Sequence, residues 1–181
     1  EESQSDPDHA KPYRENDDEL EEIPFRSIER IGPAGSVNSS VNEMARWLQF
    51  NLERGQFEGE RLIEAATIAD LHSAQMAVPA AGSGSSNVAV GYAMGWFVSV
   101  YEGHRMLNHG GGIDGFTTSV TFYPDDDLGI VTFTNVGSAL GNLVARTASD
   151  RVLGIDGNDR IAEALEQRKR ALAAQDDAEE R

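Results

Sequence analysis

The 181-residue sequence contains no cysteine. Disulfide bonds, thiol nucleophiles and thiolate-bound metal sites are therefore excluded. The sequence also has no run of 18 or more apolar residues, so we predict no membrane-spanning helix, and the polar, acidic N-terminus does not resemble a secretory signal. The cellular location stays open. A hydrophobic content of 39% is enough for one globular domain with a core.

Basic residues are scarce, and lysine is the scarcest of them. Fifteen Lys and Arg face 31 Asp and Glu, which gives a formal net charge of −16, and the only lysines are Lys11 and Lys169. This balance disfavours phosphate backbones and anionic lipid surfaces, so neither nucleic acid nor a membrane is an expected partner. Such acidity suits a salt-rich medium that screens self-repulsion, although acidic termini alone would also raise the count.

Composition divides the chain into three segments. Residues 1–22 are polar and acidic with almost no apolar side chain, which predicts a surface segment or a linker. Residues 23–155 carry the apolar periodicities of a folded domain. Residues 156–181 are rich in Ala, Glu, Arg and Gln, which predicts an exposed helix or a linker to a further domain.

Apolar residues at three- and four-residue intervals predict three helices in the middle segment, over residues 41–54, 63–72 and 139–153. Ser40 and Glu43 fit a capping box at the start of the first helix. Gly55 and Gly154 stand where C-terminal caps belong. The first helix should therefore pack one apolar face against a core, and the last should cover one face of the sheet.

Runs of β-branched and aromatic residues predict four strands, over residues 92–101, 105–108, 116–123 and 128–134. Their short connections predict antiparallel neighbours. Residues 79–87 form a loop by composition. His72 and His104 are predicted to be surface or turn residues. The expected fold class is α/β (α+β), an antiparallel β-sheet flanked by helices.

The most informative stretch of the sequence is a histidine followed by three glycines, His109 to Gly112. Backbone without side chains lets another group approach closely. An acyl-transfer site needs that access, because a backbone N–H must point at the developing oxyanion with no β-carbon in the way. The alternative is a strand-end histidine with a satisfied hydrogen bond beside a glycine-rich hairpin.

Several short motifs within residues 24–155 together resemble the β-lactamase and DD-peptidase superfamily. They are, in order, PAGS (33–36), SS (39–40), MARW (44–47), GYAMGW (91–96), HGGGIDGF (109–116), GIV (129–131) and TN (134–135). The similarity is to the class C β-lactamase-related esterases and peptidases, in which His-x-Gly replaces Lys-Thr-Gly on the edge strand of the sheet. It implies the C-terminal part of a β-lactamase/DD-peptidase-like fold.

The resemblance also implies a serine hydrolase that forms an acyl-enzyme from an ester, amide, peptide or β-lactam substrate, with no cofactor and no metal. His109 would hydrogen-bond near the nucleophile or the substrate, and the Gly112 N–H would form half of the oxyanion hole. Gly110 and Gly111 would give the substrate clearance. Trp96 and Tyr92 are further candidates for the cleft, although core packing is the default role of both.

Two motifs of that family are missing from the sequence. A Ser-x-x-Lys helix supplies the nucleophile and its base, and a Tyr-x-Asn type loop supplies a second proton-transfer group. Lys11 and Lys169 have Asp8 and Glu166 three residues before them, and no tyrosine has Asn or Ser two residues later. Both motifs precede the third in family order. We therefore expect an upstream half of the same domain to carry them, and this chain alone to be inactive.

Other interpretations of the glycine run fit less well. It matches Gly-x-Gly-x-x-Gly, but strand-forming residues follow where a dinucleotide site needs a helix. The His-Gly-Gly-Gly motif of lipases requires a later Gly-x-Ser-x-Gly, which is absent. A metal site from His109, Asp114 and residues 125–127 lacks ligand spacing. A non-catalytic binding or assembly module with the same fold remains the alternative function.

Overall fold

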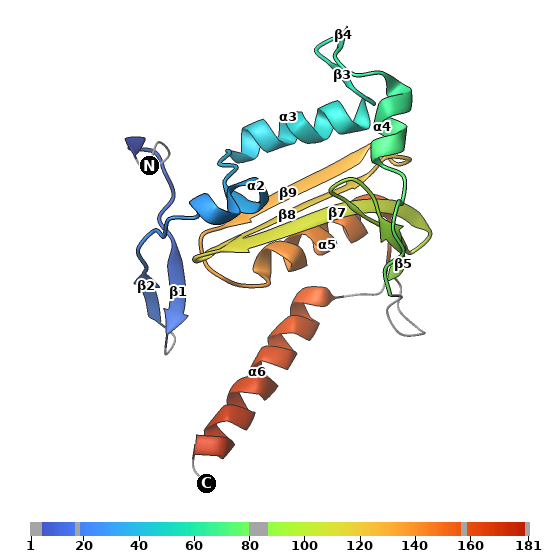
Figure 1. Cartoon of the computed structure of the whole chain (residues 1–181). Coiled ribbons are helices and arrows are strands. Elements are labelled where there is room, and N and C mark those ends of the chain that lie inside the picture. The colour runs from blue at the N-terminus through green and yellow to red at the C-terminus, as the bar shows by residue number, and fades with distance from the viewer. Residues whose placement is uncertain (1–4, 17–18, 80–86, 157–158, 180–181) are drawn as a thin grey trace.

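The computed structural model describes residues 5–16, 19–79, 87–156 and 159–179 of the chain. Its centre is an antiparallel sheet with strands in sequence order (Figure 1). The five strands are β5 (Asn87–Tyr92), β6 (Phe97–Tyr101), β7 (His104–Ile113), β8 (Phe116–Tyr123) and β9 (Leu128–Thr134). Each connection between neighbouring strands is short, which favours this antiparallel order.

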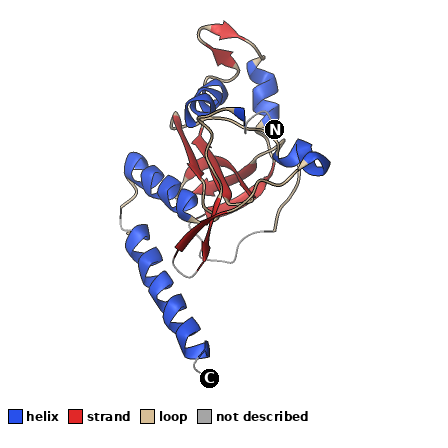
Figure 2. Cartoon of the chain, turned by 90° about the vertical axis from the view of Figure 1, so that its left-hand side faces the viewer, coloured by secondary structure: helices blue, strands red, loops and turns tan. Residues whose placement is uncertain are grey.

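Helices cover both faces of the sheet. Helix α3 (Val41–Leu52) packs on one face and α5 (Leu140–Leu153) on the other, while α6 (Arg160–Glu179) extends away from the sheet (Figures 1 and 2). The predicted fold class, an antiparallel sheet flanked by helices, is confirmed. None of the helices in the described part of the chain is long and apolar enough to cross a membrane.

The remaining elements are short. They are β1 (Tyr13–Asn16), β2 (Glu19–Glu22), the 3-10 turn η1 (Glu29–Ile31), α2 (Gly32–Gly35), β3 (Gln56–Phe57), β4 (Glu60–Arg61) and α4 (Ala65–Leu71). β1 pairs with β2 and β3 with β4, each as a separate two-stranded hairpin. These hairpins lie outside the central sheet (Figure 1).

The main core lies between the sheet and α3. Leu48 of α3 meets alternate residues of the sheet, among them Leu107, Val120 and Phe122, and all four are at most 9% exposed. Alternation places these side chains on one face, because successive residues of a strand point to opposite sides. Burial of such side chains contributes about 1.5–3 kcal/mol each and fixes the register of the strands.

The predicted capping box of α3 is confirmed. The Glu43 N–H donates to Ser40 Oγ (3.2 Å), and the Ser40 N–H donates to Glu43 Oε2 (2.8 Å). Hydrogen bonds from the Ser40 backbone and side chain lower the pKa of Glu43. The helix ends at Leu52, two residues before the predicted end, and Gly55 follows it at φ +87°. Gly154 closes α5 in the left-handed conformation, as predicted.

The predicted strand over residues 92–101 is wrong, because the chain reverses within it. Gly95 has a φ of +88°, and the reversal pairs Tyr92 of β5 with Phe97 of β6. β5 also begins at Asn87, at the end of the predicted loop, whose residues 80–86 lie outside the described structure. β7 is longer than the predicted 105–108 and includes all three glycines.

His72 lies in the turn that follows α4, one of the two positions predicted for it, but its side chain is buried. Only 5% of it is exposed, and its Nε2–H donates to Asn51 Oδ1 at 3.0 Å. Asn51 in turn donates to the Trp47 carbonyl at 2.8 Å, which fixes the orientation of the amide. Burial, with a smaller effect of the Arg105 charge, lowers the pKa of His72 to about 4. The neutral ring packs at a tilt against Phe122.

The acidic N-terminal stretch is attached to the central sheet. Pro12 is fully buried, and the Tyr13 N–H donates to the Asn135 carbonyl at 2.8 Å, just beyond β9. Gly115, in the turn between β7 and β8, lies so close to Tyr13 that an added β-carbon would come within 2.6 Å of its carbonyl oxygen. The predicted surface segment therefore includes an exposed hairpin, β1–β2, whose first strand is anchored to the sheet.

Candidate active site

The histidine and glycines of the predicted motif lie at an open edge. β6 begins at Phe97, opposite Asn108, so residues 109–113 of β7 pair with β8 on one side and with no described strand on the other. The resemblance implied an edge strand at this point. A strand with one open edge offers unpaired backbone groups to a binding partner.

The hairpin register aims the Gly112 backbone at this open edge. The turn between β7 and β8 has two residues, Asp114 and Gly115, both at positive φ. The pair flanking such a turn is hydrogen-bonded, and pairs alternate from there, so Gly112 opposite Thr117 is non-hydrogen-bonded. Consistent with this, the Thr117 carbonyl faces β9 and accepts from Thr134 Oγ1 at 3.2 Å. The Gly112 N–H therefore points away from β8.

The His109 side chain is exposed and presents one free ring nitrogen. Its Nδ1 lies 2.7 Å from the Gly110 carbonyl oxygen. A carbonyl only accepts, so Nδ1 carries the proton of this bond, and Nε2 of the neutral ring is left as an acceptor. The hydrogen bond holds the ring beside the glycines. His109 can therefore accept a proton or a hydrogen bond at the same edge to which Gly112 offers a donor.

Two aromatic rings flank His109. The Phe97 ring stacks on the imidazole at 5.8 Å between centroids, and the Tyr92 ring meets it edge-on at 6.1 Å. Tyr92 and Phe97 also contact each other at 4.8 Å. Tyr92 was a candidate for the cleft, with core packing as its default role, whereas Phe97 was missed. The undetected turn at Gly95 explains the omission, because one continuous strand would separate these two side chains.

Trp96 is part of the core instead. Its ring packs edge-on against Phe122 at 4.9 Å, within the cluster under α3. No ring contact joins it to His109 in the described structure. Of the two aromatic candidates for the cleft, the structure brings only Tyr92 to the motif, and it gives Trp96 the core-packing role.

The three glycines differ in how closely they are packed. A β-carbon added at Gly111 would meet Thr118 Oγ1 at 3.0 Å, which is tighter than most real contacts. At Gly110 the nearest atom would be the Thr118 carbonyl oxygen at 3.4 Å, and at Gly112 the Phe116 carbonyl oxygen at 3.8 Å. The described neighbours thus leave room for a side chain at Gly112. A group outside the hairpin can therefore approach the backbone closely there.

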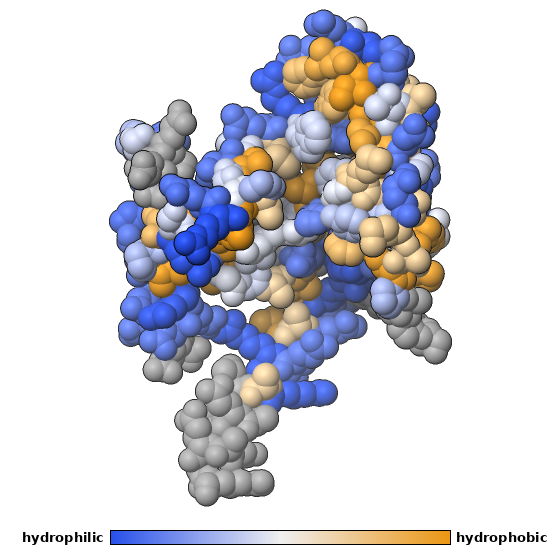
Figure 3. Space-filling model, in the orientation of Figure 1, coloured by the Kyte–Doolittle hydropathy of each residue, from blue (hydrophilic) through white to orange (hydrophobic). Residues whose placement is uncertain are grey.

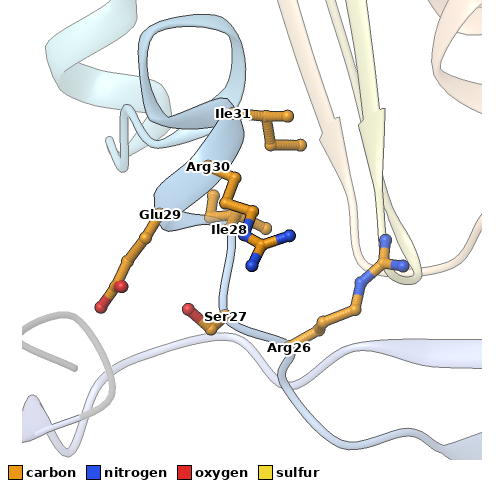
Figure 4. A pocket seen from close by; sticks show the side chains of 6 residues that line it. All are labelled: Arg26, Ser27, Ile28, Glu29, Arg30 and Ile31. Atoms are coloured by element: carbon orange, nitrogen blue, oxygen red, sulfur yellow. The ribbon is translucent and has the colours of Figure 1, made fainter.

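The tip of the β7–β8 hairpin is tied to residues 25 and 26. Arg26 forms a two-pronged ion pair with Asp114, at 2.8 Å and 3.2 Å, and Phe25 stacks on Phe116 at 6.0 Å. Beside this contact, residues 26–31 line a hollow of about 390 Å³. Arg26 and Arg30 extend to one side of the segment and Glu29 to the other (Figure 4). Sequence reasoning offered no signal for this contact, because its partners lie 88 residues apart.

Two of the carboxylates in the metal-site hypothesis, Asp114 and Asp126, contact other side chains. Asp114 pairs with Arg26, and Asp126 lies 2.9 Å from His104 Nδ1. No three His, Asp or Glu side chains converge on one point within the described ranges.

The site as it stands offers one hydrogen-bond donor and one acceptor. The donor is a backbone group and the acceptor a side-chain group, and another group can approach both at the open edge, which suits the stabilisation of an oxyanion and the transfer of a proton. A nucleophile has no partner base here, since neither lysine follows a serine by three residues. The arrangement can complete an acyl-transfer site but does not constitute one.

Comparison with known proteins finds one matching family model and two curated relatives that are named as hydrolases. A family model described as Beta-lactamase matches residues 1–153. The protein named Unguisins hydrolase ungD of Aspergillus violaceofuscus is 30% identical over 158 residues, and Unguisins hydrolase ungD' of Aspergillus campestris is 28% identical over 115. These matches cover 81% and 64% of this chain, but it spans only 28% and 20% of the relatives' lengths.

A solved structure shares the fold. The octameric penicillin-binding protein homologue from Pyrococcus abyssi matches with a TM-score of 0.66 at 22% identity, over 84% of this chain and 32% of that one. The predicted β-lactamase/DD-peptidase-like fold is therefore confirmed. The family match includes the acidic residues 1–22 and ends at the last residue of α5, before α6. Its extent and the order of the motifs within it lead to one conclusion: the chain belongs to the beta-lactamase family.

Proposed function

We propose that this chain is the C-terminal part of a serine hydrolase domain that works through an acyl-enzyme. The nucleophile and its base lie in an upstream half of the same domain, outside these residues. Gly112 donates its N–H to the oxyanion, and His109 accepts a proton or a hydrogen bond through Nε2. The substrate is a small molecule or peptide with an ester, amide or β-lactam carbonyl.

One observation carries this proposal: an unpaired backbone N–H and an exposed imidazole share the same open edge. The hairpin register directs the Gly112 N–H away from β8, and His109 is held at that edge by its bond to Gly110. A donor aimed where negative charge develops is worth about 10²–10³ in rate in acyl-transfer enzymes. A histidine at a merely structural turn would not need both features.

Exposed apolar side chains near this edge support an upstream half. Val88, Val90, Met94 and Phe97 are 44–59% exposed although they belong to β5, β6 and the turn between them. Figure 3 shows apolar side chains gathered over the region of β5 and over the end of the molecule near α4. Apolar surface of this kind marks an interaction site in a soluble domain. The small share of the relatives' length that the chain spans agrees with this reasoning.

We define the substrate class by its reactive carbonyl group. The curated relatives are named as hydrolases of unguisins, which supports hydrolysis as the reaction. Selection among esters, amides, peptides and β-lactams belongs to side chains that contact the rest of the substrate. Tyr92 and Phe97 beside His109 would form an apolar wall for that part.

Covalent labelling tests the proposal. The 181-residue chain, incubated with a fluorophosphonate or a fluorescent penicillin, should form no adduct by intact-mass spectrometry, because an unassisted serine hydroxyl is a poor nucleophile. Adding the upstream segment, fused or as a separate chain, should restore labelling at a serine of that segment. Circular dichroism of each sample verifies folding.

Two outcomes would contradict the proposal. Stoichiometric labelling of a serine within these 181 residues would show that the nucleophile is misplaced. Failure of the folded longer protein to label or hydrolyse any of these substrate classes would favour a non-catalytic binding or assembly module.

A further inference from the structure

A polar cavity lies between the sheet and α5, on the face opposite α3. Its volume is about 230 Å³, many times the roughly 10–15 Å³ that one water needs. Most of its lining is polar. The polar side chains that line it and that matter here are Asn108, Ser119, Thr121, Tyr123, Asn142 and Arg146.

Tyr123 places an unsatisfied hydroxyl in this cavity. The residue is fully buried, and its Oη has no hydrogen-bond partner among the described residues. Burial raises the pKa of Tyr123, an effect that the nearby Ser149 hydroxyl opposes, so the phenol stays a neutral donor. A buried hydroxyl without a partner is unfavourable, and native proteins keep few of them.

Three more polar side chains of the lining make no hydrogen bond to another described residue. Ser119 and Thr121 are 4% and 8% exposed, yet neither side chain makes a hydrogen bond to another described residue, and the same holds for Asn108. By contrast, Ser149 on α5 donates to the Ala145 carbonyl at 2.9 Å. The cavity therefore gathers several donors that the fold itself does not use.

The charge of the lining is positive. Arg146 is its only charged side chain, and its guanidinium lies over the Tyr101 ring at 5.3 Å. The neighbouring carboxylate of Asp150 is occupied by Arg160 at 2.6 Å and by the Tyr101 hydroxyl. Arg146 is thus free to bind a planar anion, for which a guanidinium offers two parallel N–H donors.

From this geometry we infer a second ligand site, between β7, β8 and α5, that binds a small oxyanion. Arg146 supplies the charge, and the Tyr123, Ser119 and Thr121 hydroxyls supply neutral donors. Carboxylate and phosphate groups share the required chemistry. The volume is below the range of about 300–1,000 Å³ typical of drug-sized ligands, so the ligand has only a few heavy atoms.

The site is separate from the candidate active site. Asn108 lines the cavity, whereas the next residue of β7, His109, does not. Successive side chains of a strand point to opposite faces. The inference does not rest on the proposed hydrolase function, and a chain without any hydrolytic role would still carry this site.

Isothermal titration calorimetry tests the inference. The protein is titrated with inorganic phosphate and, separately, with sodium acetate, at an ionic strength held constant with chloride. Saturable one-site binding of either anion is expected. The anion with the higher affinity shows whether the site prefers phosphate or carboxylate groups. Arg146→Met should weaken binding by about tenfold or more, because bonds to a charged group are the stronger ones.

Arg151→Met is the matched control, since Arg151 lies on the same helix but outside the lining. It should leave the affinity unchanged. If Arg146→Met does not fold, Tyr123→Phe and Asn142→Ala take its place, and each should weaken binding at least severalfold. No saturable binding of either anion, or equal weakening by Arg151→Met, would overturn the inference and leave a cavity that holds water alone.

Discussion

Alternate residues of β8 build two different surfaces on the two sides of one strand. On the side of α3 they are Val120 and Phe122, whereas on the side of α5 they are Ser119, Thr121 and Tyr123. The first side is closed by apolar contacts with Leu48 and its neighbours. The second side is buried equally well but keeps hydroxyl groups that the fold leaves unpaired.

The two faces of the sheet therefore have different roles, since the apolar face stabilises the fold and the polar face can bind a ligand. Apolar area removed from water stabilises the fold at about 25 cal/mol per Å², without regard to direction. Buried hydroxyls stabilise it little and cost free energy when they lack a partner. We therefore expect substitutions on the α3 face to act mainly on the free energy of unfolding. Substitutions on the α5 face should act mainly on anion binding.

The largest effect is expected from Phe122→Ala on the α3 face. Phe122 is fully buried, contacts Trp96 and His72, and belongs to the main core cluster. Removal of its ring should lower the free energy of unfolding by about 3–5 kcal/mol. Chemical denaturation at constant protein concentration measures this change. A loss below 1 kcal/mol would mean that this face is not the main stabilising core.

Acidification should lower the free energy of unfolding through His72, which packs against Phe122 on the same face. The folded pKa is lowered to about 4 from an unfolded value near 6.5, so the unfolded chain binds a proton first. The contribution is therefore present above pH 6.5 and is lost as the pH falls toward 4, by about 2 kcal/mol between pH 7 and pH 5. Denaturation at both values, with His72→Gln as the control, isolates the effect. An identical pH dependence in His72→Gln would contradict it.

Two substitutions at neighbouring residues of β8 compare the two faces directly, and the second of them should have the smallest effect on stability. Val120→Thr puts a hydroxyl into the apolar face and should destabilise the protein by about 1–3 kcal/mol. Thr121→Val removes an unpaired hydroxyl and should change stability by less than about 0.5 kcal/mol while it weakens anion binding. Equal losses of stability in the two variants would show that the faces do not differ as described.

Much of the fold could be predicted from the sequence where one local signal was sufficient. β8 and β9 have the predicted limits, and the Ser40–Glu43 capping box and the Gly154 cap are present. The reversal at Gly95 was missed because glycine within an apolar run is also compatible with a strand interior. The burial of His72 was missed because its partner, Asn51, lies 21 residues earlier.

The candidate site was predictable in its backbone and less so in its surroundings. The run from His109 to Gly112 was recognised from its composition, and its position at an open edge follows from the resemblance. Phe97 depends on a turn that was not predicted, and the Arg26–Asp114 pair depends on contacts distant in sequence. The cavity under α5 depends on how a helix packs over a strand, which periodicity alone does not specify.

The most direct test of the proposed function is the acylation rate of His109→Ala in the protein that includes the upstream segment. His104→Ala is the matched control, since His104 begins the same strand and contacts Asp126 instead of the glycines. Burst-phase kinetics with a chromogenic ester or β-lactam should show a loss of about 10²–10³ for His109→Ala, or roughly 3–4 kcal/mol, with the fold intact. His104→Ala should acylate at the unmodified rate. An unchanged rate in His109→Ala would contradict the catalytic role of the open edge.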